Sequence, residues 1–164
     1  MRIANPKLFR SALVLAAFII LADQASKWAV ARLLQDPPQV IELTPFFNLV
    51  AALNTGVSFS MLQGAGPWLL IVAATGVSLA LAHWLTKLTA TLPAMAVGLI
   101  IGGALGNVID RIRVGAVFDF LDFYLGDWHW PAFNLADSAI SVGVALLLLD
   151  GLFHRADQGK TERS

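Results

Sequence analysis

The sequence contains no cysteine, only three histidines and few charged residues. The lack of cysteine excludes disulfides, thiol nucleophiles and thiolate metal sites. His83, His129 and His154 lie far apart, without the spacing of metal ligands, so neither a metal nor another cofactor is expected. The formal net charge is zero and no basic stripe interleaved with aromatic residues is present, so no nucleic-acid partner is expected either.

Apolar residues are abundant instead. They make up 57% of the chain, whereas charged residues make up 13%, about half the share usual in soluble domains. Four apolar stretches each come near the length of about 17–25 residues that crosses a bilayer as a helix. They cover residues 8–34, 67–85, 92–109 and 138–153. The sequence therefore predicts an α-helical integral membrane protein with four transmembrane helices.

The first stretch has an alternative interpretation. Arg2, Lys7 and Arg10 before an apolar core resemble the start of a cleavable signal peptide. However, the stretch continues at helical spacing as ADQASKWAVARLL without a clean small-x-small cleavage site, and three further spans follow. These features favour a first transmembrane helix.

The basic residues predict the orientation of the spans, because cytoplasmic loops carry an excess of lysine and arginine. Four spans place both termini and the short turn between the second and third spans on the same side of the membrane. Its basic residues are Arg2, Lys7, Arg10, Lys87, Arg155, Lys160 and Arg163. The opposing residues Arg32, Arg111 and Arg113 have acids nearby. Both termini are therefore predicted to face the cytoplasm.

The remaining segments then face outward. Residues 33–66 are rich in β-branched and aromatic residues and are interrupted by Pro45 and Gly56, which predicts a small β-rich segment on the membrane surface. No internal repeat is present. We expect a single membrane domain over residues 1–155 and a polar cytoplasmic tail over 156–164.

Polar residues of different spans are predicted to meet at one depth. At about 1.5 Å per helical residue, Asp23 and Lys27 lie roughly 20–25 Å above Arg10, and Asn107, Asp110 and Arg111 lie roughly 21–27 Å above Pro93. Asp137 begins the fourth span from the outer side. This convergence near the outer leaflet is what an intramembrane site requires.

Asp119 and Asp137 are the strongest catalytic candidates. Neither has a lysine or arginine within four residues. Carboxylates near a bilayer cost free energy, and they persist there mostly when they do chemistry or carry ions. The phenylalanines that flank Asp119 favour its protonated form, whereas a helix N-terminus favours an ionised Asp137. Such a pair can activate water and protonate a leaving group. From the residues alone, Asp122 could replace Asp119, and Asp137 could be a simple N-cap.

Other polar and small residues have structural as well as functional interpretations. Asp23 and Lys27 share a helix face and can form a neutral pair that fixes packing. Asp110 is expected to form a salt bridge with Arg111, which could also bind an acceptor on a substrate or lipid. Gly102, Gly103 and Gly106 permit close helix approach or leave room for a substrate backbone. Asn54 and Asn134 could each bind a peptide or cap a turn.

Several motifs, in order along the four spans, resemble one family. They are LADQASKW, NTGVSFSML, GGALGNVIDRI, VFDF and FNLADSAISVG. Together they are similar to bacterial lipoprotein signal peptidase, also called signal peptidase II. The resemblance covers about residues 10–155.

The resemblance implies an intramembrane aspartyl endopeptidase with a catalytic pair at Asp119 and Asp137, which decides against Asp122. It would remove signal peptides from diacylglyceryl-modified prolipoproteins by cutting just before the lipid-bearing cysteine. The matched positions assign the substrate pocket to Asn54, Asn107, Arg111 and Asn134. They give Asp23, Gln24, Lys27 and, beside them, Asp110 a supporting role.

One departure from the family pattern is that Val57 and Ser58 follow the NTG motif, where small residues are frequent. This difference would affect substrate access or inhibitor fit and leave the chemistry unchanged. The expected setting is the bacterial cytoplasmic (inner) membrane, with the active site near the periplasmic face, prolipoproteins and membrane lipid as partners, and a monomeric chain. The alternative function is a small ion-coupled transporter or channel in which buried acids carry protons, but it predicts inverted repeats that the sequence does not show.

Overall fold

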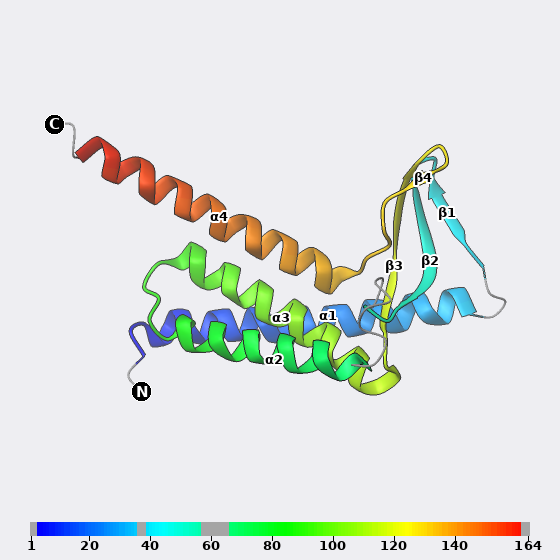
Figure 1. Cartoon of the computed structure of the whole chain (residues 1–164), viewed down its shortest axis with the longest axis horizontal. Helices are drawn as coiled ribbons and strands as arrows, with labels where there is room; N and C mark the ends of the chain where they lie inside the picture. The colour runs from blue at the N-terminus through cyan, green and yellow to red at the C-terminus, as the bar shows by residue number, and fades with distance from the viewer. Residues whose placement is uncertain (1–2, 36–38, 57–65, 162–164) are drawn as a thin grey trace.

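The computed structural model describes residues 3–35, 39–56 and 66–161. Val57, Ser58 and the end of the predicted tail lie outside these residues. Four long helices and one small sheet make up the described chain (Figure 1). The helices are α1 (Pro6–Gln35), α2 (Gly66–Leu85), α3 (Thr91–Val114) and α4 (Leu135–Thr161), and each contains a stretch long and apolar enough to span a membrane. The prediction of four spans is confirmed.

Helix α3 is the central helix. Two thirds of its apolar stretch is buried inside the protein, compared with about a fifth for each of the others. It packs against α1, α2 and α4. Glycines make this packing close, since a Cβ at Gly98 would lie 2.6 Å from the carbonyl oxygen of Ala12, and one at Gly102 would lie 2.8 Å from that of Ala16. For Gly102, and for Gly103, which lies as close to Ala136 of α4, the predicted role in helix packing is confirmed.

The sheet is assembled from two segments far apart in the sequence. Strands β1 (Ile41–Thr44) and β2 (Phe47–Asn54) follow α1, whereas β3 (Val117–Leu125) and β4 (Trp128–His129) lie between α3 and α4. All neighbours are antiparallel, in the order β1-β2-β3-β4. The predicted β-rich segment is therefore real, and it forms only one half of the sheet.

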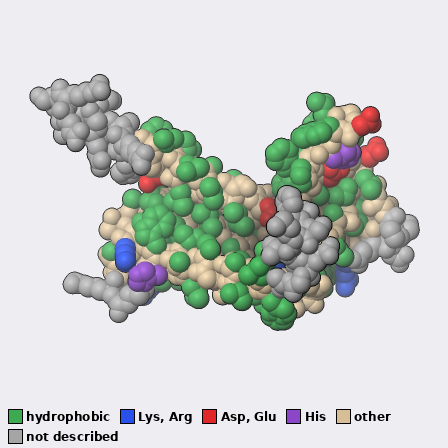
Figure 2. Space-filling view, in the orientation of Figure 1, with side chains coloured by type: hydrophobic (Ala, Val, Ile, Leu, Met, Phe, Trp, Pro, Cys, Tyr) green, Lys and Arg blue, Asp and Glu red, His purple; other side chains and the backbone are tan. Residues whose placement is uncertain are grey.

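The sheet lies at one end of the helices, and both chain termini lie at the other end (Figure 1). Apolar side chains cover much of the helical part of the face in Figure 2, as expected for a surface in contact with lipid. The second half of α4 diverges from the other helices in Figure 1. The first turns of α4, in contrast, lie against α3 and the base of the sheet, where the polar residues gather.

Candidate active site

Strand β3 places Asp119 at the junction between the sheet and the helices. Helix α3 ends at Gly115, whose left-handed backbone (φ 74°) turns the chain into β3 within a few residues. The Asp119 side chain is buried, with 1% of the residue exposed. Its Oδ1 accepts a hydrogen bond from Nδ2 of Asn134 at 2.6 Å, and its Oδ2 accepts one from Nδ2 of Asn54 at 2.9 Å.

Asp137 lies in the first turn of α4, and Asn134 is the N-cap residue. The Asn134 Oδ1 accepts a hydrogen bond from the backbone N–H of Asp137 at 3.0 Å, and the Asp137 Oδ2 accepts one from the backbone N–H of Asn134 at 3.2 Å. This reciprocal arrangement is a capping box. The alternative in which Asp137 itself is the N-cap is therefore wrong, because Asp137 occupies the third helical position and its carboxylate points back over the helix start.

Asn107 connects the two carboxylate environments with α1. Its Oδ1 accepts hydrogen bonds from Nζ of Lys27 at 3.0 Å and from Nδ2 of Asn134 at 3.2 Å. Its Nδ2 donates to Oδ1 of Asp137 at 2.7 Å. The three contacts fix which end of the amide faces Asp137, since only the nitrogen can donate and both oxygen contacts come from donors.

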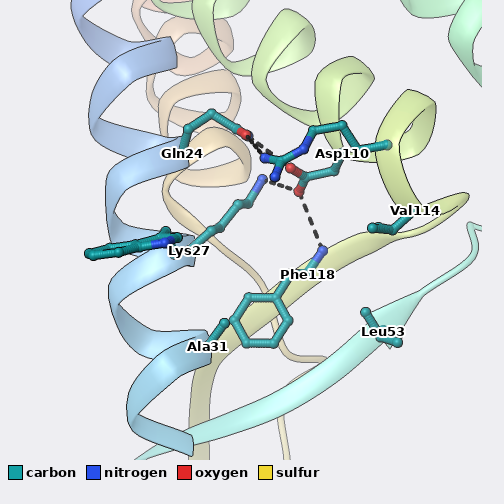
Figure 3. A pocket seen from close by; sticks show the side chains of 9 residues that line it. Gln24, Lys27, Ala31, Leu53, Asp110, Val114 and Phe118 are labelled. Atoms are coloured by element: carbon teal, nitrogen blue, oxygen red, sulfur yellow. Dashed lines mark hydrogen bonds and ion pairs between the residues drawn. The ribbon is translucent and has the colours of Figure 1, made fainter. Parts of the chain in front are cut away.

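A buried ion cluster contacts Asn107 through Lys27. Figure 3 shows its Lys27, Asp110 and Gln24 side chains. Nζ of Lys27 lies 2.7 Å from an oxygen of Asp23 and 2.7 Å from one of Asp110. The other oxygen of Asp23 accepts the backbone N–H of Ala136 at 3.0 Å, so the cluster also binds the N-terminus of α4. Nε2 of Gln24 donates to Asp110 at 2.8 Å. The predicted supporting group is therefore brought together as one unit.

One predicted contact is wrong. Among the described residues Asp110 pairs with Lys27, and no salt bridge to Arg111 is present. Consecutive residues of a helix point in different directions, so Asp110 faces α1 and Arg111 faces away from it. Arg111 instead donates a long hydrogen bond (3.4 Å) to the backbone oxygen of Asn107, and its buried Nε has no hydrogen-bond partner within the described chain.

Arg111, Asn107 and Asp137 form the polar end of a cleft of about 420 Å³ between α2, α3 and α4. The walls of this cleft are apolar and come from Leu70, Ala73, Ala74, Val77, Ile100, Ala104 and Ile140. A second recess, of about 350 Å³, reaches Asp137 from another side, beside Trp130, Phe133, Ser138 and Ser141. Asp137 is therefore accessible from two directions.

The two carboxyl groups differ in their environments. Burial raises the pKa of Asp119 above its ordinary value of 3.8, hydrogen bonds from Asn54 and Asn134 act in the opposite direction, and the nearby negative charge of Asp137 raises the pKa further. Asp137 has the N-terminus of α4 beside it and two N–H donors on its carboxylate. The two carboxyl groups therefore differ in burial and in their hydrogen-bond partners.

Asp122 does not join this group. Its carboxylate is 2.9 Å from Nδ1 of His129, and it accepts a hydrogen bond from Nδ2 of Asn48 at 3.2 Å. Asp122 is three positions after Asp119 along β3, and an odd offset places the two side chains on opposite faces of the strand. In the described residues, no group of three or more histidine, cysteine or acidic side chains is arranged to hold a metal ion.

The sequence interpretation missed two features of this site. The bridge from Lys27 through Asn107 to Asp137 depends on three helices and has no signal in any one segment. The capping box does have a signal, namely the Asn134-x-x-Asp137 spacing ahead of an apolar run. All the predicted substrate-pocket residues lie around the two aspartates. The side-chain amides of Asn107 and Asn134, however, form most of their hydrogen bonds with other residues of the protein.

Comparison with known proteins identifies the family. Residues 15–153 match the family described as signal peptidase (SPase) II. The chain belongs to the signal peptidase II family. Members of this family are aspartic peptidases, so the predicted enzyme class is confirmed and the transporter alternative is set aside.

Individual relatives agree with this family. The chain is 49% identical over 142 residues to the lipoprotein signal peptidase of Aeromonas hydrophila subsp. hydrophila, covering 84% of this chain and 85% of that protein. It is 46% identical over 151 residues to that of Shewanella oneidensis, covering 88% of each. A solved bacterial membrane enzyme at 2.3 Å resolution shares the fold with a TM-score of 0.77 and 27% identity, over 90% of both chains.

Proposed function

We propose that this signal peptidase II cleaves diacylglyceryl-modified prolipoproteins just before the lipid-bearing cysteine, with Asp119 and Asp137 as its catalytic pair. One observation carries the proposal. Asn134 donates to the Asp119 carboxylate and caps the helix that carries Asp137, and Asp137 lies at the polar end of an apolar cleft between three membrane-spanning helices. The lipoprotein signal peptidases among its relatives act, by their name, on the same class of protein.

The two environments suggest separate roles. An ionised Asp137 takes a proton from water as the water attacks the scissile carbonyl carbon. A protonated Asp119 gives a proton to the carbonyl oxygen and, after the tetrahedral intermediate has formed, the pair returns a proton to the leaving amine as the C–N bond breaks. The Arg111 side chain lines the same cleft, and its guanidinium supplies a donor for a substrate carbonyl. Asn54 would contact the substrate from the sheet side.

The cleft suits a substrate that arrives within the membrane. Its apolar walls accept the hydrophobic core of a signal peptide and acyl chains, and its polar end accepts the peptide bond to be cut. We further propose that the chain acts as a monomeric domain over residues 1–155 in the bacterial inner membrane. Both termini and the tail would be cytoplasmic and the sheet would be periplasmic. The basic residues support this orientation, and both termini lie opposite the sheet (Figure 1).

The proposal is tested by cleavage of one purified prolipoprotein with and without its diacylglyceryl group, in the same detergent. Mass spectrometry should show cleavage immediately before the modified cysteine, and the unmodified protein should be cut far more slowly. Each buried methylene of the missing chains contributes about 0.8 kcal/mol to membrane placement. Equal rates for the two substrates would overturn the lipid requirement, and cleavage at another bond would overturn the proposed specificity.

A further inference from the structure

A further groove, drawn in Figure 3, lies where α1 and the end of α3 meet the sheet. It has a volume of about 360 Å³ and lies between α1, the end of α3 and strands β2 and β3. Its lining residues are Gln24, Lys27, Trp28, Ala31, Leu53, Asp110, Arg113, Val114 and Phe118. Leu53 pairs with Phe118 across the two strands, whereas Asp119 is the next residue on β3 and points to the opposite face. The groove is therefore separate from the proposed active site.

The walls of this groove are apolar and exposed. Trp28, Leu53 and Val114 are each at least 60% exposed, although they face a partly enclosed space. Tryptophan is enriched where a membrane helix leaves the hydrocarbon for the headgroup region, and Trp28 lies near the end of α1 that adjoins the sheet. The groove thus opens at the level of lipid headgroups and offers apolar surface to an acyl chain.

The charged side chains at the floor of the groove are paired with carboxyl or ammonium groups of the protein. Lys27 is paired with Asp110 and Asp23. The second oxygen of Asp110 accepts a hydrogen bond from Gln24, and Asp110 is only 7% exposed. The Asp110 carboxyl group is buried, and both of its oxygens have hydrogen-bond partners. It offers no open acceptor to a cationic ligand.

The rim is cationic. Arg113 is exposed, and its guanidinium contacts the neutral oxygen of Gln24 at 3.3 Å. Arg32 lies over the Trp28 ring, 4.4 Å from its centroid, one helical turn beyond it. Within residues 3–35, 39–56 and 66–161, neither arginine forms an ion pair with a carboxylate. Asp36, four residues after Arg32 in the sequence, lies outside the described residues, and Arg113 is therefore the principal cation of the rim.

We propose that this groove binds one anionic glycerophospholipid from the leaflet that borders the sheet. The phosphate would lie beside Arg113, with Arg32 as a second cation, because a guanidinium donates to phosphate oxygens in a forked geometry. One acyl chain would lie over Trp28, Ala31 and Phe118. The site would stabilise the contact of α1 with the sheet, and it does not depend on the peptidase activity.

The test uses delipidated, full-length protein in a neutral detergent, with phosphatidylglycerol or phosphatidylcholine added, and counts bound lipids by native mass spectrometry. The protein should retain one phosphatidylglycerol in preference to phosphatidylcholine. Arg113→Gln should lower the phosphatidylglycerol occupancy about fivefold, the effect expected for one basic residue beside an anionic lipid. The matched control is Arg10→Gln, an exposed arginine at the opposite end of α1, and it should bind as the unaltered protein does.

Three outcomes would overturn the proposal. They are equal retention of the two lipids, unchanged retention in Arg113→Gln, and an equal loss in Arg10→Gln. A photoactivatable phosphatidylglycerol should also label peptides that contain Trp28 or Val114, and labelling confined to other peptides would contradict the site. Thermal unfolding without lipid should be the same for all three proteins, which would show that Arg113→Gln still folds.

Discussion

A single amide, that of Asn134, determines how the two aspartates lie relative to each other. Its oxygen caps the helix that carries Asp137, and its nitrogen donates to Asp119 and Asn107. Asn107 in turn presents its nitrogen to Asp137 because Lys27 and Asn134 occupy its oxygen. At the residue scale, therefore, the asparagines act mainly by orienting the carboxylates, and the charge of Lys27 fixes the orientation of Asn107.

Replacement of Asn107 separates a positioning role from substrate binding. Asn107→Ala removes a hydrogen bond to an ionised carboxylate, worth about 1.5–3 kcal/mol, so kcat should fall by roughly 10- to 150-fold with KM little changed. The matched control is Asn48→Ala, which removes a hydrogen bond to Asp122 outside the site and should change kcat little. A raised KM with unchanged kcat would show instead that Asn107 binds substrate, as the family resemblance implies.

The raised pKa of Asp119 predicts how stability depends on pH. Between its ordinary pKa of 3.8 and the higher folded value, the folded protein binds more protons than the unfolded chain. This contribution to stability is present at acidic pH and is lost as pH rises through the folded pKa. Asp119→Asn has no carboxyl group to titrate at this position. The unfolding temperature of the variant minus that of the unaltered protein should therefore increase from pH 4 to pH 8. A pH-independent difference for Asp119→Asn would contradict the assignment.

At the scale of elements, the position of α4 against α3 decides where Asp137 lies. A Cβ at Gly103 would clash with the backbone oxygen of Ala136 and with the Ile140 side chain. Ala136 precedes Asp137 directly, so any displacement there moves the carboxylate proposed to be catalytic. The backbone N–H of Ala136 is also held by Asp23, so α1 and α3 both contribute to the position of this helix start.

Gly103→Ala should therefore lower both stability and activity. Overpacking of a tight interface costs about 1–3 kcal/mol, which thermal unfolding in detergent would detect, together with a reduced kcat. Gly76→Ala on α2 is the control, because nothing lies within 4 Å of its added Cβ and alanine favours a helix over glycine by up to about 1 kcal/mol. Equal stability of the two variants would show that α3 and α4 approach each other less closely than described.

The sequence predicts helices more completely than it predicts their contacts. Periodic apolar stretches locate the four spans, but the third continues five residues past Ile109 until Gly115 ends it, and the fourth begins at Leu135 because Asn134 caps it. The pairing of β2 with β3, which lie in segments about 70 residues apart and include an irregular register between Leu49 and Ala52, has no local signal. The choice of Lys27 over Arg111 as the partner of Asp110 depends on how α1 and α3 face each other.

At the scale of the whole molecule, membrane helices and a surface sheet meet at one polar site. The helices supply Asp137, Asn107 and Arg111 together with an apolar cleft, and the sheet supplies Asp119 and Asn54. Neither part alone contains both carboxylates. The central claim is therefore that Asp119 and Asp137 work as a pair in hydrolysis of the substrate peptide bond.

Turnover of a diacylglyceryl-modified prolipoprotein by purified Asp119→Asn and Asp137→Asn proteins tests this claim most directly. An amide can neither accept the proton of water nor return it, so each variant should lose at least about a hundredfold in kcat while its unfolding in detergent remains cooperative. Asp127→Asn should retain full turnover and Asp122→Asn substantial turnover. Turnover close to that of the unaltered protein in either Asp119→Asn or Asp137→Asn, with the substrate cut at the same bond, would contradict the account.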